Sequence, residues 1–268
     1  MSTPLFLVDA FSREPFRGNP AGVCLLPSWR PREWLAGLAA EVNASETAFL
    51  VREGSRFHLR WFTPKVEVPL CGHATLASAH VLFEAGLAPE PDRVVFTTLS
   101  GELAAERSGD RIELDFPLIG VRECESGEAL VAALGVRPVA VGIAGDRPGR
   151  ADVNYLCILD SERAVRDVRP DFDGLRRLPA SVIVSARGSG PYAIVSRYFA
   201  PAVGIDEDPV TGSAHCVLAA YWAPKLGRDR FLAWQASNRG GEIEVTVRGS
   251  RVGLAGHAVT ISSGDCRV

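Results

Sequence analysis

Short runs of alternating apolar and polar residues dominate the chain and predict a strand-rich protein. They are rich in Val, Ile, Leu, Phe and Tyr, and turns rich in Gly, Pro, Asp and Arg separate them. In the first half the predicted strands are Leu5–Val8, Gly22–Leu26, Thr47–Val51, Phe57–Phe62, Val94–Thr98, Glu102–Arg107 and Arg111–Asp115. In the second half they are Asn154–Leu159, Ser181–Ser185, Ala193–Tyr198, Glu242–Val247 and Gly256–Ile261.

Helical patterns are fewer. The segment from Pro31 to Val42 begins with Pro at a first-turn position and continues with apolar residues on one face. His73–Gly86 and Ser213–Trp222 are apolar almost all round, which predicts buried helices. Asp171–Leu178 predicts a short polar helix. The Gly- and Pro-rich connection from Pro117 to Val153 predicts the boundary between two halves.

The two buried helices follow similar segments of sequence. Phe62-Thr63-Pro64 and then Cys71-Gly72-His73-Ala74 precede the first helix. Phe199-Ala200-Pro201 and then Thr211-Gly212-Ser213-Ala214 precede the second. Each copy has a strand, a Phe-x-Pro turn, a loop and a glycine before an apolar helix. This repetition suggests two similar halves.

Composition excludes several classes of function. The chain has 268 residues, 47% of them hydrophobic and 23% charged, which suits a packed globular protein. A net charge of −3 with scattered Arg residues favours neither nucleic acid nor an anionic membrane as partner. We see no signal peptide or membrane-spanning run, and the six Cys occur singly. We therefore expect a soluble cytoplasmic protein without a metal cluster.

A helix that begins after a glycine exposes unpaired backbone N–H groups and the positive end of its dipole. Such an end binds a carboxylate or phosphate without a cationic side chain. For a single copy, we favour a glycine that only permits close packing or a turn. Two copies in matching contexts favour anion binding, at Gly72 and at Gly212.

Three side chains are candidates for proton transfer. Glu46 stands at the start of an apolar strand, where partial desolvation would raise its pKa toward a useful range. The alternatives are a solvated turn residue and a helix cap. His73 follows the glycine of the first copy and would face the same anion site. Asp208 precedes the second helix and either complements its dipole or lies opposite His73 across a cleft.

Cys71 precedes the first glycine, where the helix dipole could lower its pKa and make the thiolate a base. The matching residue of the second copy is Thr211, which cannot act in this way. A racemase with two thiols is therefore excluded. A dehydratase with one thiol and a mechanism without a thiol both stay open.

Collinear blocks over nearly the whole chain resemble the PhzF-like family, named for its phenazine-biosynthesis member and related to diaminopimelate epimerase. The strongest block is Glu207-Asp208-Pro209-Val210-Thr211-Gly212-Ser213-Ala214-His215. The others include Phe16-Arg17-Gly18-Asn19-Pro20-Ala21-Gly22-Val23, Ser45-Glu46-Thr47-Ala48-Phe49, Arg60-Trp61-Phe62-Thr63-Pro64, Cys71-Gly72-His73-Ala74-Thr75 and Arg197-Tyr198-Phe199-Ala200-Pro201.

The resemblance implies an α+β fold of two similar domains, each a curved, mostly antiparallel sheet around a central helix, with the site between them. We assign residues 1–117, with a C-terminal strand near 256–268, to the first domain and 118–255 to the second. By resemblance Glu46 moves the proton, and His73 and Asp208 assist. Gly72, Gly212 and Ser213 would hold a substrate carboxylate, and Asn19 has a weaker claim to contact it.

These observations predict a cofactor-independent isomerase that acts on a small carboxylate and, by family resemblance, forms a homodimer. An epimerase or dehydratase that uses Cys71 is the first alternative. A non-catalytic protein that binds a small ligand is the second.

Overall fold

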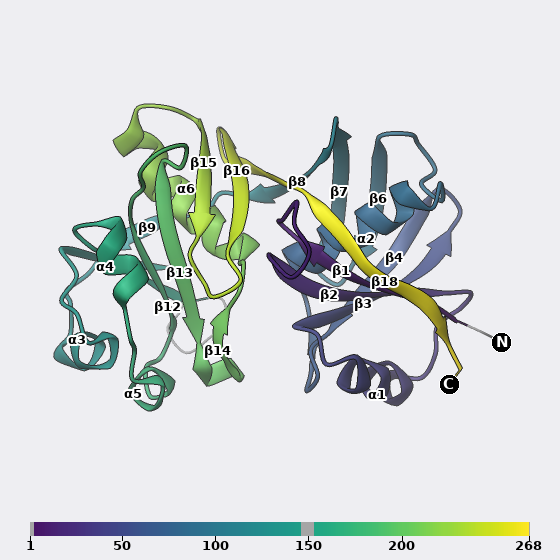
Figure 1. The fold of residues 1–268 in the computed structure, drawn as a ribbon, viewed down its shortest axis with the longest axis horizontal. Helices are drawn as coiled ribbons and strands as arrows, with labels where there is room; N and C mark the ends of the chain where they lie inside the picture. Colours follow the sequence, from purple (N-terminus) through teal and green to yellow (C-terminus); the bar gives the residue numbers. More distant parts are fainter. Residues whose placement is uncertain (1–2, 146–152, 268) are drawn as a thin grey trace. The chain divides into compact units, whose positions relative to one another are not determined.

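The computed structural model describes residues 3–145 and 153–267, which fall into two compact units. The first unit comprises Met1–Asp115 and Ala255–Val268, and the second comprises Phe116–Leu254. Figure 1 shows the elements of each unit along the chain. The predicted α+β class is confirmed, since each unit combines a mostly antiparallel sheet with a few helices.

The first unit contains nine strands and two helices in the described residues. Its strands are β1 (Thr3–Ala10), β2 (Asn19–Leu26), β3 (Glu46–Glu53), β4 (Arg56–Phe62), β5 (Glu67–Val68), β6 (Arg93–Thr98), β7 (Gly101–Ser108), β8 (Arg111–Pro117) and β18 (Ala258–Cys266). Its helices are α1 (Arg32–Val42) and α2 (Gly72–Glu84).

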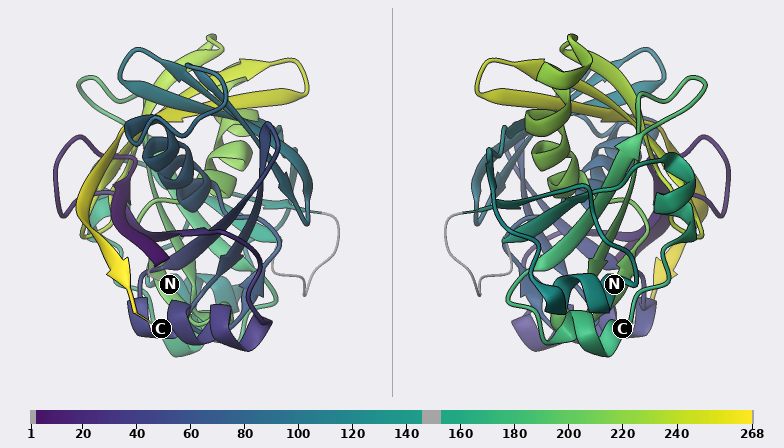
Figure 2. Two further views of the ribbon diagram at one scale, coloured as in Figure 1. Left: turned by 90° about the vertical axis from the view of Figure 1, so that its right-hand side faces the viewer. Right: turned by 90° about the vertical axis from the view of Figure 1, so that its left-hand side faces the viewer.

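The sheet of the first unit runs β18, β1, β2, β3, β4, β6, β7 and β8. Among the described residues of this sheet, only the pairs β2/β3 and β4/β6 are parallel. The helix α2 packs against β1, β2, β3, β7 and β18, and nine of its residues are buried. Figure 2 shows strands that curve around this helix. An apolar helix is therefore the centre of the core, as its all-round apolar pattern predicts.

The second unit is built from the remaining elements. Its strands are β9 (Val121–Glu123), β10 (Ala140–Ala144), β11 (Asn154–Ile158), β12 (Ser181–Arg187), β13 (Ile194–Ala200), β14 (Ile205–Asp208), β15 (Arg230–Gln235), β16 (Gly241–Arg248) and β17 (Arg251–Gly256). Its helices are α3 (Glu128–Leu134), α4 (Glu162–Asp167), α5 (Phe172–Arg176) and α6 (Gly212–Leu226), with a short 3₁₀ turn at Pro201–Val203.

The two units share one connectivity. In the second unit the sheet runs β9, β10, β11, β12, β13, β15 and β16, with parallel pairs β11/β12 and β13/β15. The sequence of parallel and antiparallel pairs matches β18 to β7 of the first unit. The helix α6 lies between β14 and β15 in the chain, as α2 lies between β5 and β6. The repeated motif in the sequence therefore marks a repeated structure.

The connection from Pro117 to Val153, predicted as the boundary between two halves, begins next to the point where the two units divide, between Asp115 and Phe116. It contains β9, α3 and β10, and part of it lies outside the described residues. Its helix Glu128–Leu134 consists of good helix formers and ends at Gly135 in the left-handed conformation (φ 69°). Short elements between turn residues carry too few periodic positions for a pattern to predict them.

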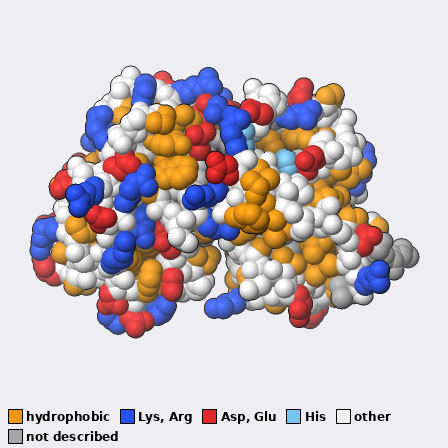
Figure 3. Space-filling view, in the orientation of Figure 1, with side chains coloured by type: hydrophobic (Ala, Val, Ile, Leu, Met, Phe, Trp, Pro, Cys, Tyr) orange, Lys and Arg blue, Asp and Glu red, His pale blue; other side chains and the backbone are white. Residues whose placement is uncertain are grey.

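Two observations concern helix length and surface charge. Among the described residues, no helix is long and apolar enough to cross a membrane. On the face shown in Figure 3, basic and acidic side chains are interspersed. That face therefore carries no stripe of one charge for a nucleic-acid backbone.

Candidate active site

Three chemically active side chains come together in the first unit. Glu46 is the first residue of β3, Cys71 directly precedes α2, and His73 is the second residue of α2. Their exposed fractions are 9%, 7% and 5%. The burial of Glu46 rules out the interpretation as a solvated turn residue.

The sheet places these groups together because α2 packs on the strands that carry the others. β2 and β3 pair in parallel, with Ala21 opposite Glu46, and α2 packs against both strands. Asn19, the first residue of β2, is fully buried beside the same helix start. The preceding Gly18 has φ 67°, and a Cβ there would lie 2.1 Å from the carbonyl oxygen of Ala10. Only glycine can therefore occupy position 18, directly before Asn19.

The imidazole of His73 is the centre of the cluster. Its Nε2 lies 3.1 Å from Oε2 of Glu46. Its Nδ1 lies 3.2 Å from the side-chain amide nitrogen of Asn19 and 3.5 Å from Sγ of Cys71. The ring is therefore held from both sides, and Nε2 faces the carboxylate. Because Asn19 occupies Nδ1, the proton on the opposite nitrogen points toward Glu46.

The surroundings shift two pKa values in this cluster. Burial alone would lower the pKa of His73, but its interactions with Cys71 and Glu46 outweigh burial and raise the pKa well above its usual value. Burial raises the pKa of the Cys71 thiol to about 11, and the neighbouring Glu46 carboxylate acts in the same direction. The amide nitrogen of Asn19 can only donate to Nδ1, so the proton of the His73 ring lies on Nε2, beside a thiol that burial keeps protonated.

Asp208 lies in the second unit, where it ends β14 and is buried. The hydroxyl of Thr211 donates to its carboxylate at 2.5 Å. Gln235 holds this turn from β15: its amide oxygen accepts from the backbone N–H of Thr211, and its amide nitrogen donates to the carbonyl of Asp208, both at 2.8 Å. Sequence reasoning missed Gln235. Its alternation with buried Phe231 and Ala233 was the available signal.

Both glycine-led helices begin where the sequence predicts. α2 starts at Gly72 and α6 at Gly212, and at neither start does the N-cap side chain bond to the helix. Ser213 is exposed at the second start. Free first-turn N–H groups are the feature that an anionic group would use. Carboxylate binding at these two ends stays a prediction.

His215 of α6 supports the fold and has a measurable pH signature. It is fully buried, and its Nδ1 donates to the carbonyl oxygen of Thr211 at 2.8 Å. Burial lowers its pKa to about 4, below the usual 6.5, so the folded protein resists protonation that the unfolded chain accepts. Stability should therefore fall as the pH drops from about 6.5 to 4, by about 3 kcal/mol in total for this group.

Urea unfolding monitored from pH 7 to pH 4 would measure this loss. A His215→Gln variant should show a shallower pH dependence over that interval, with His58→Gln as the control for a partly exposed histidine. An unchanged slope in the His215 variant would contradict the assignment.

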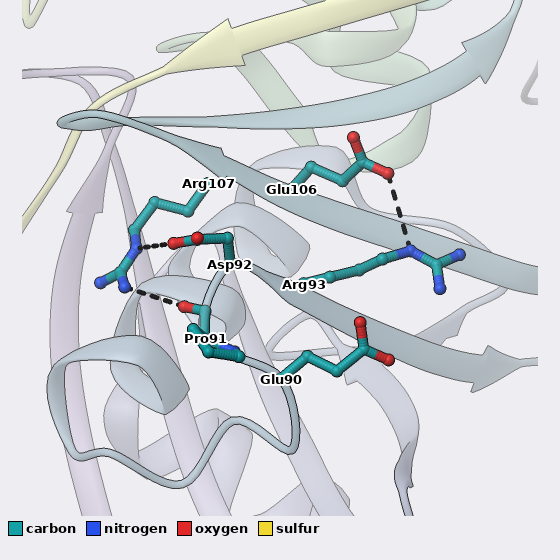
Figure 4. Close-up of a pocket in the computed structure, with 6 residues that line it drawn as sticks. All are labelled: Glu90, Pro91, Asp92, Arg93, Glu106 and Arg107. Carbon is teal, nitrogen blue, oxygen red and sulfur yellow. Dashed lines mark hydrogen bonds and ion pairs between the residues drawn. The ribbon is translucent and has the colours of Figure 1, made fainter.

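A hollow of about 370 Å³ lies elsewhere in the first unit, at the turn before β6 and along β7. Figure 4 shows that four of the five charged side chains that line it are paired: Arg107 with Asp92 at 3.2 Å, and Arg93 with Glu106 at 3.6 Å. Arg107 also donates to the carbonyl oxygen of Pro91 at 2.8 Å. Because these groups serve one another, the hollow is not a candidate for chemistry.

The fold is of the epimerase-like class, and comparisons with known proteins give the family. The family model described as phenazine biosynthesis-like protein (PhzC-PhzF) matches residues 8–264. An uncharacterized isomerase of Pseudomonas aeruginosa is 51% identical over 263 residues, 97% of each chain. A crystal structure of a PhzF-family protein from Enterococcus faecalis superimposes with a TM-score of 0.94 at 39% identity, over 100% of both chains.

The chain therefore belongs to the phenazine biosynthesis-like family, which confirms the resemblance seen in the sequence. Its enzyme class is isomerase, as predicted. A predicted epimerase from Pseudomonas aeruginosa, 20% identical with a TM-score of 0.77 over 100% of both chains, shares the fold alone.

Proposed function

We propose that the protein is a cofactor-independent isomerase that moves a proton on a small carboxylate substrate, with Glu46 as the acid and base. The observation that carries this proposal is the buried contact of 3.1 Å between Glu46 and His73, beside a glycine-led helix start. A buried carboxylate held by an imidazole is suited to accept a proton from carbon and to return it.

In this reaction the Glu46 carboxylate takes a proton from a carbon of the substrate and becomes a carboxylic acid. The carboxylic acid exchanges its proton with solvent and then returns a proton to another carbon, so the substrate changes its bonding without net loss of atoms. The Nε2–H of His73, 3.1 Å from Glu46, is placed to stabilise the carboxylate by a hydrogen bond before and after the transfer. The backbone N–H groups at Gly72 are suited to hold the substrate carboxylate, and Asn19 fixes His73. In the second unit, Gly212 and Ser213 offer a helix start that is suited to an anionic group in the same way.

The role of Asp208 is proposed separately, because Asp208 belongs to the second unit whereas Glu46, Cys71 and His73 belong to the first. Its hydrogen bond from Thr211 and the support from Gln235 fix the carboxylate firmly at the approach to α6. We propose that it assists proton transfer or holds a polar group of the substrate. A cytoplasmic location and a homodimer remain predictions.

Incubation of the protein with a panel of small carboxylates in D₂O tests the function without knowledge of the product. A substrate should gain deuterium at carbon in the presence of the protein, and nuclear magnetic resonance would locate the exchanged position. A non-catalytic ligand-binding protein would instead be stabilised against heat by a compound that gains no deuterium. That outcome would overturn the proposed isomerase.

The alternative base, Cys71, is disfavoured by its surroundings. Because the pKa of Cys71 is raised to about 11, little of this thiol is ionised near neutral pH. Its contact with His73 is the observation that favours Cys71 as the base. We expect Cys71→Ser to retain exchange within about tenfold of the wild type, because a residue that does not abstract the proton contributes only packing. Loss of exchange as complete as in a Glu46 variant would instead establish a thiol-dependent epimerase or dehydratase.

A further inference from the structure

The cluster that we assign to proton transfer also has the composition of a transition-metal site. Glu46, Cys71 and His73 each offer one ligand atom, and these atoms all lie within 4.8 Å of one another. The three residues are buried. We propose that they form an inhibitory site for Zn²⁺, in which the ion takes the place of the transferred proton. The inhibition by Zn²⁺ rests on the proposed function, whereas the binding of Zn²⁺ does not.

The distances suit a tetrahedral ion closely. Zinc bonds of about 2.0–2.3 Å at tetrahedral angles separate neighbouring N and O ligands by about 3.3 Å and neighbouring S and N ligands by about 3.6 Å. In the structure Nε2 of His73 lies 3.1 Å from Oε2 of Glu46 and 4.0 Å from Sγ of Cys71. Small side-chain rotations bring both distances to the required values. The sequence predicted no metal site because it lacks the short spacings typical of metal ligands. Such spacings cannot reveal Glu46, which lies 25 positions before Cys71.

The ligand types select the kind of ion. A thiolate and an imidazole favour Zn²⁺ and similar ions over Mg²⁺ or Ca²⁺, which prefer oxygen ligands. The side-chain amide of Asn19 lies beside Nδ1 of His73, on the side away from the metal nitrogen. Once Nε2 binds the ion, Nδ1 carries the ring proton, and the amide would turn to present its oxygen as the acceptor that metal-binding histidines ordinarily have. On binding, the Cys71 thiol and any protonated Nε2 of His73 release their protons to solvent, and the metal–sulfur and metal–nitrogen bonds form.

The consequence for the reaction is direct. A bound ion would occupy the carboxylate and imidazole that handle the substrate proton. Zn²⁺ should therefore inhibit deuterium exchange, whereas Mg²⁺ should not.

Metal binding can be measured on the whole protein without substrate. Metal-free protein titrated with Co²⁺ should bind one ion per chain at this site and show a sulfur-to-cobalt charge-transfer band in the near ultraviolet. Cys71→Ser should remove the band and weaken Zn²⁺ binding by at least about 100-fold, more than the loss of a supporting residue costs. A variant in which both partly exposed cysteines, Cys124 and Cys266, are replaced by Ser should keep the band.

The outcomes separate the two proposals. A band that persists in Cys71→Ser, or that disappears in the Cys124/Cys266 variant, overturns the metal site and leaves the isomerase proposal intact. Binding that depends on Cys71 but leaves exchange unchanged at saturating Zn²⁺ overturns the inhibition. If no carboxylate gains deuterium, the function fails, while the Co²⁺ spectrum still decides whether the site exists. Circular dichroism of each variant confirms that it folds.

Discussion

Replacement of Glu46 with Gln is expected to reduce the rate of deuterium exchange by about 10²–10⁴-fold, which is the usual contribution of a positioned acid or base. The amide has nearly the shape of the carboxylate but cannot accept the substrate proton. Its contact with His73 can persist as a hydrogen bond, since Nε2 lies 3.1 Å away. Substrate binding should therefore change little while turnover is lost.

Two measurements check this result. The rate of deuterium incorporation reports turnover, and the shift of the melting temperature with added substrate reports binding. Glu53→Gln is the matched control, because Glu53 ends the same strand β3 but is exposed to solvent. Wild-type exchange in Glu46→Gln would reject this residue as the proton carrier, whereas equal losses in both variants would indicate a structural effect on β3.

The second large effect concerns Arg197 in the second unit. Its guanidinium donates to both carboxylate oxygens of Glu207, at 2.7 and 2.9 Å, and to the carbonyl oxygen of Val168 at 2.8 Å. It also lies over the ring of Phe199, 4.9 Å from its centroid. Arg197 itself is 8% exposed. This side chain therefore links β13 to the approach to Asp208 and to the segment after α4.

Arg197→Met should destabilise the folded protein by about 3–5 kcal/mol, because it leaves a mostly buried carboxylate and a carbonyl group without their donor. Urea unfolding would measure the cost. Arg230→Met is the control: Arg230 also extends from a strand to a single glutamate, Glu244, but its side chain is 69% exposed, and such pairs contribute about 0–1 kcal/mol.

A double variant completes this test. Arg197→Met with Glu207→Gln should recover part of the lost stability, since no unpaired charge remains. Equal destabilisation by the Arg197 and Arg230 variants would show that burial does not strengthen the interaction. No recovery in the double variant would show that the bonds to backbone carbonyls, and not the ion pair, provide the stability.

Local patterns in the sequence predicted most of the regular elements, because a strand or helix imposes its own period on the residues that form it. The buried helices α2 and α6 are clear cases, and the structure places their starts at Gly72 and Gly212. β15 escaped the prediction although Phe231, Ala233 and Gln235 alternate, because a polar residue at an inward position interrupts the apolar pattern. The helix α6 continues beyond its predicted end through Pro224 to Leu226, since packing of the helix outweighs the loss of one backbone bond.

By itself, the sequence determined the strand-rich class, the two glycine-led helices and the candidate residues Glu46, Cys71 and His73. Only the tertiary structure decided that β18 pairs with β1 from the far end of the chain. It also decided that Glu46, Cys71 and Asn19 surround one imidazole, and that Gln235 supports Asp208. The physical reason is the distance along the chain over which each feature is determined. The period of a strand or helix depends on residues that are close in the sequence. These contacts instead depend on how segments far apart in the sequence pack together, which no local pattern encodes.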